Sequence, residues 1–428
     1  MRGGIGRIKK IAVPLFMLSC AVWYWYETVS YLVPKLGGVS DLRKYYDAAR
    51  QIVEGHSPFA TAGYIYPPLL AELLTPLAHL DYLAARWVWY LVSQVCLLLA
   101  AWLIWRAFGR DWVVACSIAL VWGMGGAASE ALWLGQVSPL LALLLAAAYT
   151  STQWRQGAAL GVGCALKFIP GLLAIGLLLN RSRAGLLAFL ASVSVLLALP
   201  WLYVSCCLGG PRTPVGTDMW TGTPAPLSWS LPSTVLRLLD RPQHPGELPP
   251  NWSVVELTDL RLPGPERAAS VATAAGTVIA GALLLFIAVG GRLSAEQLPW
   301  AMAGLLSLGL AASPVSWTHY QAMQYPGVAM LLAHSFRGHR WTLLSGALVC
   351  AAALHPLPVA VLGAYYRQHN TWNAVPLAAL YFWTSAATVA SLVLFGLFVR
   401  EARRASAPAP GEPAVTRLGS GRPARSLR

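Results

Sequence analysis

Long apolar runs recur from one end of this chain to the other, and no other feature constrains its fold as strongly. Segments such as 184–204 and 374–399 contain no charged residue. A helix of about 20 apolar residues crosses the hydrocarbon core of a bilayer. Only 11% of the residues are charged and 57% are hydrophobic, whereas soluble domains carry about 25% charged residues. Since alternating strand patterns are absent, the sequence predicts an all-α polytopic membrane protein.

The spacing of these runs predicts a bundle of about twelve transmembrane helices within one membrane domain, residues 1–404. The stretch 157–179 fits either one helix or two short halves broken at Phe168-Ile169-Pro170. We favour the two halves, because they return the chain to the side that it left. Residues 11–33 are expected to be an uncleaved signal anchor. The other predicted spans are 82–105, 112–128, 137–150, 184–204, 268–290, 298–312, 321–336, 341–364 and 374–399.

The net charge of +14 does not indicate a nucleic acid partner, because surplus Lys and Arg of polytopic proteins collect in cytoplasmic loops. Applied to these spans, that rule predicts a multi-pass protein of the plasma (inner) membrane with both termini in the cytoplasm. The first outer loop departs from the rule, since it contains Lys35, Arg43, Lys44 and Arg50. These cations indicate either binding of an anionic lipid or phosphate, or simple anchoring at the membrane interface.

Three segments lie outside the predicted spans. Residues 34–80 form the first outer loop, in which Pro67–Leu80 is too short to cross and is expected to be a re-entrant or interfacial helix. Residues 205–267, rich in Pro, Gly and Trp, form a long outer loop that is expected to act as a lid or to bind an acceptor. Residues 405–428 are expected to be a disordered, basic cytoplasmic tail.

An amphipathic helix is predicted over residues 40–54 of the first outer loop. Leu42, Tyr45, Ala49 and Ile52/Val53 recur at helical spacing, and Ser40 is a candidate N-cap. Asp41 then lies in the first turn, where the helix dipole keeps a carboxylate ionised and able to act as a base. From the spacing alone, Asp41 is either a general base or a residue that merely caps the helix.

Other polar residues stand out against the apolar background. Asp47 follows Asp41 by six positions, about 240° around a helix, so the two carboxylates are not expected to face one substrate. Lys167 is embedded in an apolar stretch, and such residues normally face a partner or a polar cavity; neutralising a phosphate is the role considered for it. Gln136 fits hydrogen bonding to sugar hydroxyls or packing of a helix turn, and Tyr66 is a candidate for stacking on a sugar.

An ordered series of short motifs resembles glycosyltransferase family 87, whose members are polytopic enzymes of the C-type membrane glycosyltransferase superfamily. The resemblance runs from about residue 38 to residue 335. The motifs are Asp41, Tyr45-Tyr46-Asp47-Ala48-Ala49, Gly55-His56-Ser57-Pro58-Phe59, Tyr66-Pro67-Pro68-Leu69, Gly135-Gln136-Val137-Ser138-Pro139, Lys167-Phe168-Ile169-Pro170 and Ser313-Pro314-Val315-Ser316-Trp317-Thr318-His319-Tyr320.

The resemblance implies inverting transfer of a sugar from a polyprenyl-phosphate donor to a glycolipid or glycan acceptor, in a cavity on the outer face of the bundle. Asp41 corresponds to the catalytic aspartate of the family and His319 to its functional histidine in a later outer loop. His319 is expected to contact the donor phosphate or assist proton transfer; an interfacial histidine with a structural hydrogen bond is the alternative. Mannose is the default sugar. Arg43 and Lys44, with Lys167, Gln136 and Tyr66, are the expected substrate-binding residues.

Two other classes of protein stay open at this point. A lipid or polysaccharide transporter or flippase would place ionisable residues near the middle of the bilayer, whereas most polar residues here fall in predicted outer loops. A membrane acyltransferase or polymer ligase would need a His/Asp or Arg/His pair. No cluster of His, Asp and Glu has metal-ligand spacing, so no metal ligand is assigned and metal dependence stays open. The lipid-linked sugar is a substrate rather than a cofactor.

Overall fold

The structure is a computed structural model that describes residues 2–32, 40–209, 231, 292–313, 318–355 and 374–405. Within this part of the chain every regular element is a helix, and no strand occurs. The predicted all-α class is therefore confirmed. The predicted span 268–290, most of the predicted loop 205–267 and the tail beyond residue 405 lie outside the described residues.

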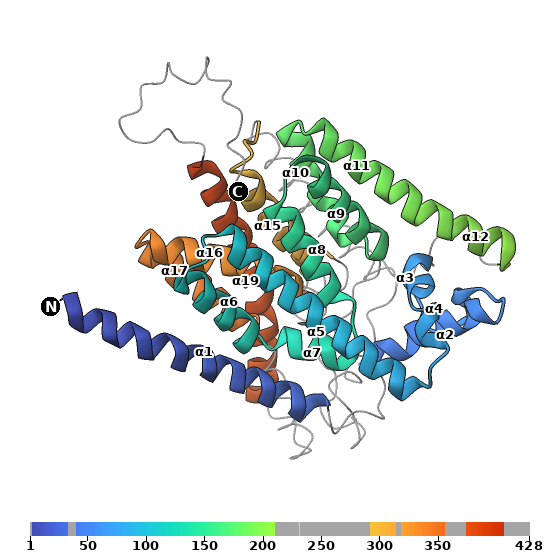
Figure 1. Ribbon diagram of the computed structural model, residues 1–428, viewed down its shortest axis with the longest axis horizontal. Helices are drawn as coiled ribbons and strands as arrows, with labels where there is room; N and C mark the ends of the chain where they lie inside the picture. Colours follow the sequence, from blue (N-terminus) through green and yellow to red (C-terminus); the bar gives the residue numbers. More distant parts are fainter. Residues whose placement is uncertain are drawn as a thin grey trace.

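Long helices make up much of the molecule (Figure 1). They include α1 (Arg2–Leu32), α5 (Tyr82–Ala107) and α19 (Ala374–Arg404). A further continuous run combines α11 (Arg183–Val193), a π-helical turn η4 (Ser194–Ala198) and α12 (Leu199–Cys207). By length and composition, three helices of the described part are able to cross a membrane, or four if one bent pair counts as a span. The number of about twelve spans stays a prediction.

The bent pair occupies the predicted span 112–128, which ends earlier than expected. Helix α6 (Trp112–Met124) stops at two glycines, and α7 (Ala127–Leu134) continues at an angle of 52° to it. Gly126 has a φ of +59°, a conformation that L-residues rarely adopt. The glycines therefore break the helix, and α7 turns toward α8 (Ser138–Thr150).

The stretch 157–179 forms two halves, as predicted. Helix α9 (Gln153–Leu166) ends at Lys167, whose backbone is extended, and the chain continues into η3 (Ile169–Leu173) and α10 (Ala174–Asn180). Gly171 contacts Cys164 across the break, and Gly157 at the start of α9 lies against Gly185, just after α10. The chain thus folds back at Lys167 and returns toward its starting side.

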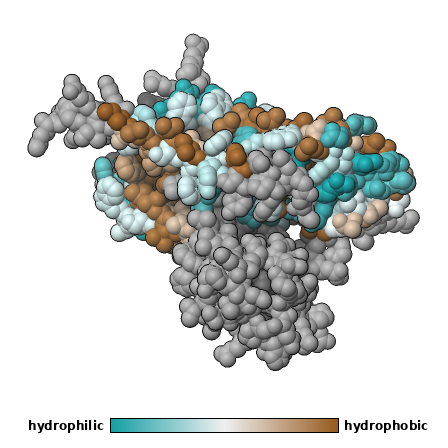
Figure 2. Space-filling model, turned by 90° about the horizontal axis from the view of Figure 1, so that it is seen from below, coloured by the Kyte–Doolittle hydropathy of each residue, from teal (hydrophilic) through white to brown (hydrophobic). Residues whose placement is uncertain are grey.

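The predicted helix 40–54 is α2 (Asp41–Val53), and the predicted short helix after Pro67 is divided into α3 (Pro68–Leu73) and α4 (Thr75–Ala78). A single turn η2 (Pro58–Ala60) lies between them. These elements pack together at one end of the molecule, to the right in Figure 1. Hydrophilic side chains gather at the same end in Figure 2, beside apolar surface of the bundle. The face of α2 that was expected to be buried is buried, except for exposed Val53.

The remaining helices differ from their predicted bounds at two places. Helix α15 (Leu298–Ala312) matches its predicted span. Helix α16 (Tyr325–Arg337) is preceded by a 3-10 segment, η7 (Thr318–Gln324), within the predicted span 321–336. Helix α17 (Trp341–Ala353) ends well before residue 364, because His355 precedes Pro356 and a residue before proline disfavours the α conformation.

The turns predicted to share the cytoplasmic side are connected in space by polar contacts. Arg337, the last residue of α16, pairs with Asp111 just before α6. Glu401 on α19 is 1% exposed at its side chain and pairs with Arg340, Arg404 and His334. Two further hydrogen bonds, Gln297 to the carbonyl of Ala402 and Asn180 to the carbonyl of Leu293, join the adjoining turns. This end of the molecule is called the arginine end below.

Candidate active site

Asp41 is the first residue of α2, as the sequence predicted. Its backbone position gives the carboxylate the favourable field of a helix N-terminus. Ser40 occupies the N-cap position, but its hydroxyl makes no cap hydrogen bond. That hydroxyl lies 2.6 Å from the hydroxyl of Tyr82 at the start of α5. Ser40 therefore ties α2 to α5 instead of capping it, and the prediction of a side-chain cap was wrong.

Gln136 reaches Asp41 through a sharp turn between α7 and α8. Gly135 ends α7 in the left-handed conformation, with a φ of +67°. A Cβ at this glycine would lie 2.5 Å from the Cβ of Leu42, so only glycine allows α2 to pack so closely. The indole Nε1 of Trp89 donates to the carbonyl of Gly135 at 2.8 Å. The turn is fixed from both sides, which places Gln136 beside α2.

The side-chain amide of Gln136 makes hydrogen bonds within the protein through both its nitrogen and its oxygen. Its Nε2 donates to a carboxylate oxygen of Asp41. Its Oε1 accepts from the hydroxyl of Tyr45 at 3.1 Å and from the hydroxyl of Tyr66 at 3.4 Å. Gln136 is 1% exposed and Tyr45 is not exposed at all. The amide is therefore engaged with Asp41 and two tyrosines rather than left open for sugar hydroxyls.

Lys167 lies at the break between α9 and η3, and its amine lies over the faces of two aromatic rings. Its Nζ is 3.2 Å from the ring centroid of Tyr320 and 5.4 Å from that of Tyr66. The amine is buried and has no hydrogen-bond partner among the described residues. Burial lowers the pKa of Lys167 well below its usual value, and the charge of Asp41 opposes that shift in part. A buried amine that lies against ring faces and lacks a hydrogen-bond partner in the described part of the chain is suited to binding an anion.

His319 lies next to Lys167 on η7. Its ring centroid is 4.7 Å from that of Tyr320. Both ring nitrogens are buried, and neither has a hydrogen-bond partner in the part of the chain that the structure describes. Burial, followed by the charge of Lys167, lowers the pKa of His319 well below its usual value. The imidazole is thus neutral at pH 7, with one N–H and one lone pair available to a ligand.

The two other basic candidates, Lys44 and Arg43, lie on different sides of α2. The Nζ of Lys44 pairs with the second carboxylate oxygen of Asp41 at 3.0 Å, and its side chain is 42% exposed. Arg43 instead pairs with Asp47 at 3.0 Å and covers the ring of Tyr82. The structure therefore brings Lys44 to Asp41 but not Arg43. It also separates Asp47 from Asp41, as the helical spacing predicted.

These contacts define one group of side chains, called the Asp41 cluster below. It joins a carboxylate able to accept a proton to a buried amine and a neutral imidazole able to contact an anion. Two members, Tyr45 and Tyr320, were not predicted as site residues, although both stand beside a candidate in the sequence. Among the described residues, no group of three or more His, Cys, Asp and Glu side chains is placed to hold a metal ion. The members are Asp41, Tyr45, Tyr66, Gln136, Lys167, His319 and Tyr320.

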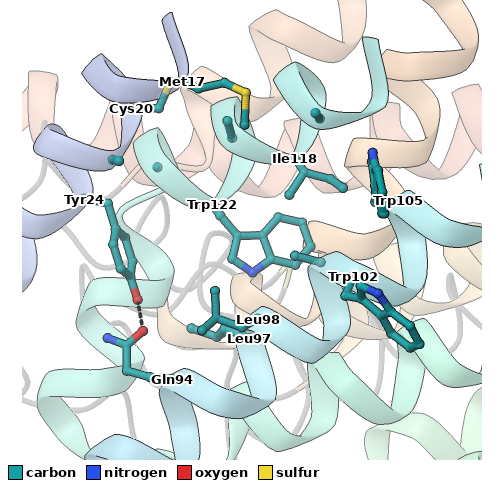
Figure 3. A pocket seen from close by; sticks show the side chains of 15 residues that line it. Met17, Cys20, Tyr24, Gln94, Leu97, Leu98, Trp102, Trp105, Ile118 and Trp122 are labelled. Carbon is teal, nitrogen blue, oxygen red and sulfur yellow. Dashed lines mark hydrogen bonds between the residues drawn. The ribbon is translucent and has the colours of Figure 1, made fainter. Parts of the chain in front are cut away.

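A separate groove of about 540 Å³ lies between α1, α5 and α6 (Figure 3). Its walls are mainly apolar and aromatic, with Trp102, Trp105 and Trp122 among them. Tyr24 donates to Gln94 at 2.7 Å on this wall. No member of the Asp41 cluster lines the groove, so this groove and the cluster are distinct features.

Residues 64–230 match the model of glycosyltransferase family 87. The matched region covers less than half of the chain, so the match is a similarity to this family. It supports the assignment of the chain as a membrane glycosyltransferase and agrees with the resemblance predicted from the motifs. The matched region contains Tyr66, Gln136 and Lys167. Asp41 and His319 lie outside it and join these residues in space.

Among solved structures, the chain is similar to the crystal structure of ArnT from Cupriavidus metallidurans in the apo state. The sequence identity is 15%, and the match covers 90% of this chain and 77% of that one. The TM-score is 0.39. At that score, neither a substrate nor the role of any residue is transferred from ArnT to this glycosyltransferase.

Proposed function

We propose that this glycosyltransferase moves a sugar, mannose by default, from a polyprenyl-phosphate carrier to a hydroxyl of a glycolipid or glycan on the extracytoplasmic face of the plasma membrane. Asp41 is the general base. The single observation that supports this most directly is the convergence of Asp41, Lys167 and His319, from three distant parts of the chain, in the Asp41 cluster.

The reaction is an inverting displacement. Asp41 accepts the proton of the acceptor hydroxyl, and the oxygen attacks the anomeric carbon of the donor sugar. The new glycosidic C–O bond forms as the bond between that carbon and the phosphate oxygen breaks, and the electron pair leaves with the polyprenyl phosphate. Asp41 is partly exposed, with 27% of its side chain accessible, so an acceptor hydroxyl can reach it while Gln136 on its other side stays buried.

The leaving phosphate is the anion that Lys167 and His319 suit. An ammonium held away from water interacts strongly with an arriving phosphate, because little solvent screens the pair. The neutral imidazole of His319 supplies an N–H donor to a phosphate oxygen. The ring of Tyr320 contacts both groups and helps to bury the amine.

A lipid-linked donor fits the setting of this site better than a nucleotide sugar does. The enzyme is a membrane protein, and a polyprenyl-phosphate sugar enters laterally from the bilayer. No glycine-rich phosphate loop following a strand and no Asp-x-Asp motif occurs in the sequence. The donor carries its leaving group with it, which places a phosphate next to the base without a bound nucleotide.

The proposal is tested with purified full-length protein in lipid nanodiscs, given polyprenyl-phosphate mannose, polyprenyl-phosphate arabinose or a nucleotide sugar, with a total glycolipid extract as acceptor. We expect transfer from one polyprenyl-phosphate donor, a product of inverted anomeric configuration by NMR, and loss of transfer in Asp41→Asn. Transfer from the nucleotide sugar alone would overturn the donor class. Donor crossing vesicle membranes without transfer, unchanged in Asp41→Asn, would indicate a transporter instead.

A further inference from the structure

Both oxygens of the Asp41 carboxylate are occupied, but by partners of very different accessibility. One oxygen pairs with Lys44, whose side chain is 42% exposed. The other accepts from Gln136, which is 1% exposed. An exposed lysine exchanges readily with water or with a substrate hydroxyl. The bond from Gln136 is therefore the permanent support of the carboxylate, and the position held by Lys44 is the one that an acceptor can take.

The orientation of the Gln136 amide is set by the two tyrosines. Reversed, the amide would turn its oxygen toward the carboxylate and its N–H groups toward Tyr45 and Tyr66. Burial raises the pKa of Tyr45 well above its usual value and that of Tyr66 to about 12. Both phenols therefore stay protonated and can donate to the Gln136 oxygen. Two donors on that oxygen leave only the N–H groups to face Asp41.

From this geometry we infer that Gln136 is a positioning residue for the base, oriented by Tyr45 and Tyr66, which holds the Asp41 carboxylate in one orientation through a buried hydrogen bond. The inference rests on the proposed role of Asp41. An N–H donor to the charged form of a carboxyl group favours that form, and a buried bond to a charged group is stronger than an exposed one. Gln136 therefore prepares the base without itself exchanging protons.

The three residues also link the base to the phosphate end of the cluster. Tyr66 donates to Gln136 and lies beneath the amine of Lys167. The ring of Tyr45 meets that of Tyr66 edge to face, with centroids 4.9 Å apart. Positioning of the base and of the anion site thus depends on the same buried tyrosine.

The test measures the protonation of Asp41 without relying on turnover. A carbodiimide reacts with the protonated carboxyl group, and peptide mass spectrometry of the full-length protein reads the product at Asp41, either as an acylurea or as an amide with Lys44. The pH at which half of Asp41 is modified is compared between the wild type and Gln136→Met, Gln136→Glu and the double variant Tyr45→Phe/Tyr66→Phe. Tyr46→Phe is the matched control, since Tyr46 lies on the same helix but donates to Leu80 outside the cluster.

We expect the midpoint to rise by about one pH unit or more in Gln136→Met, because an N–H donor to a charged group is lost. In Gln136→Glu it rises further, because two neighbouring carboxyl groups resist double ionisation. The double tyrosine variant shifts in the same direction as Gln136→Met, and Tyr46→Phe stays at the wild-type value. A variant that does not fold is recognised by its melting curve, and the double variant Tyr45→Phe/Tyr66→Phe, which adds no charge beside Asp41, carries the test in that case.

Unchanged midpoints in both Gln136 variants would overturn the inference, because a residue that only packs does not alter protonation of its neighbour. The Gln136 and tyrosine variants, together with Asp41→Asn, are then assayed for transfer with polyprenyl-phosphate mannose. Full transfer by Asp41→Asn would defeat the proposed function while leaving a shifted midpoint intact. A lost transfer in Asp41→Asn together with unshifted midpoints would defeat only the role of Gln136.

Discussion

The arginine end and the Asp41 cluster both bury ionisable groups, but they differ in whether those groups have polar partners. Glu401 is surrounded by Arg340, Arg404 and His334, each within ion-pair distance. Lys167 and His319 are buried with no hydrogen-bond partner among the described residues. A buried charge that is fully paired holds helices together, whereas one without a partner costs free energy unless a ligand supplies it. This difference indicates a structural role for the arginine end and a ligand-binding role for the Asp41 cluster.

The largest stability effect is expected at the arginine end. Glu401→Ala should lower the free energy of unfolding by about 2–3 kcal/mol, because it removes a buried carboxylate from two arginines and a histidine. The loss stays below that of a fully buried pair, since the partners keep 34–44% of their side chains exposed. Thermal melting in detergent checks the stability, and transfer per folded molecule should stay close to the wild type. A large loss of transfer by folded Glu401→Ala would contradict a purely structural role for the arginine end.

The opposite pattern is expected at Lys167. Lys167→Met should lower kcat/KM for the donor by about tenfold to a hundredfold, the worth of one charged contact to a phosphate. Its melting temperature should equal or exceed that of the wild type, because an unpaired buried amine is removed. Lys44→Met, which changes an exposed lysine beside the same aspartate, is the control for charge. A destabilised Lys167→Met with normal donor kinetics would show that Lys167 supports the fold instead.

Gly135→Ala should lower both stability and transfer. It changes the turn that holds Gln136 in place and leaves every side chain of the Asp41 cluster unchanged. The left-handed backbone alone costs an alanine roughly 1–2 kcal/mol, and the new Cβ collides with Leu42. The turn must shift, which moves Gln136 away from Asp41. Melting temperature and transfer are expected to fall together. Normal transfer in Gly135→Ala would mean that the close packing of α2 on this turn is not needed.

The smallest effect is a pH dependence of donor binding. Burial lowers the pKa of Lys167, so its ammonium is present at low pH and is lost as pH rises, earlier than for an ordinary lysine. Donor affinity, measured with a fluorescent polyprenyl phosphate, should therefore fall several-fold as pH rises through the lowered pKa. Lys167→Met should flatten this dependence. A dependence that is unchanged in the variant would assign it to another group.

Much of the local structure around the site could be predicted from periodicity and charge. The spacing of Leu42, Tyr45 and Ala49 predicted α2 and placed Asp41 at its start. The return of charge to one side after this stretch predicted a break at Phe168-Ile169-Pro170, and the observed break begins at Lys167, one residue earlier. Both features depend on residues close in sequence, whose preferences are local.

The partners across the site could not be predicted in this way. Periodicity shows which face of a helix is buried but not which residue it meets. The bond from Gln136 to Asp41 depends on the left-handed turn at Gly135 and its packing against Leu42. The position of Tyr320 against Lys167 depends on how η7 and α9 approach each other. His319 was assigned to the site from the motif resemblance, since nothing in its own neighbourhood distinguishes it from an interfacial histidine.

One paired measurement tests the central claim, that the carboxylate of Asp41 performs the chemistry of this site. Asp41→Asn and Asp47→Asn remove the same charge from the same helix, six positions apart in the sequence. We predict that Asp41→Asn still binds fluorescent polyprenyl phosphate but transfers sugar about 10²–10⁴-fold more slowly, whereas Asp47→Asn stays close to the wild type. Equal rates in the two variants would contradict the account.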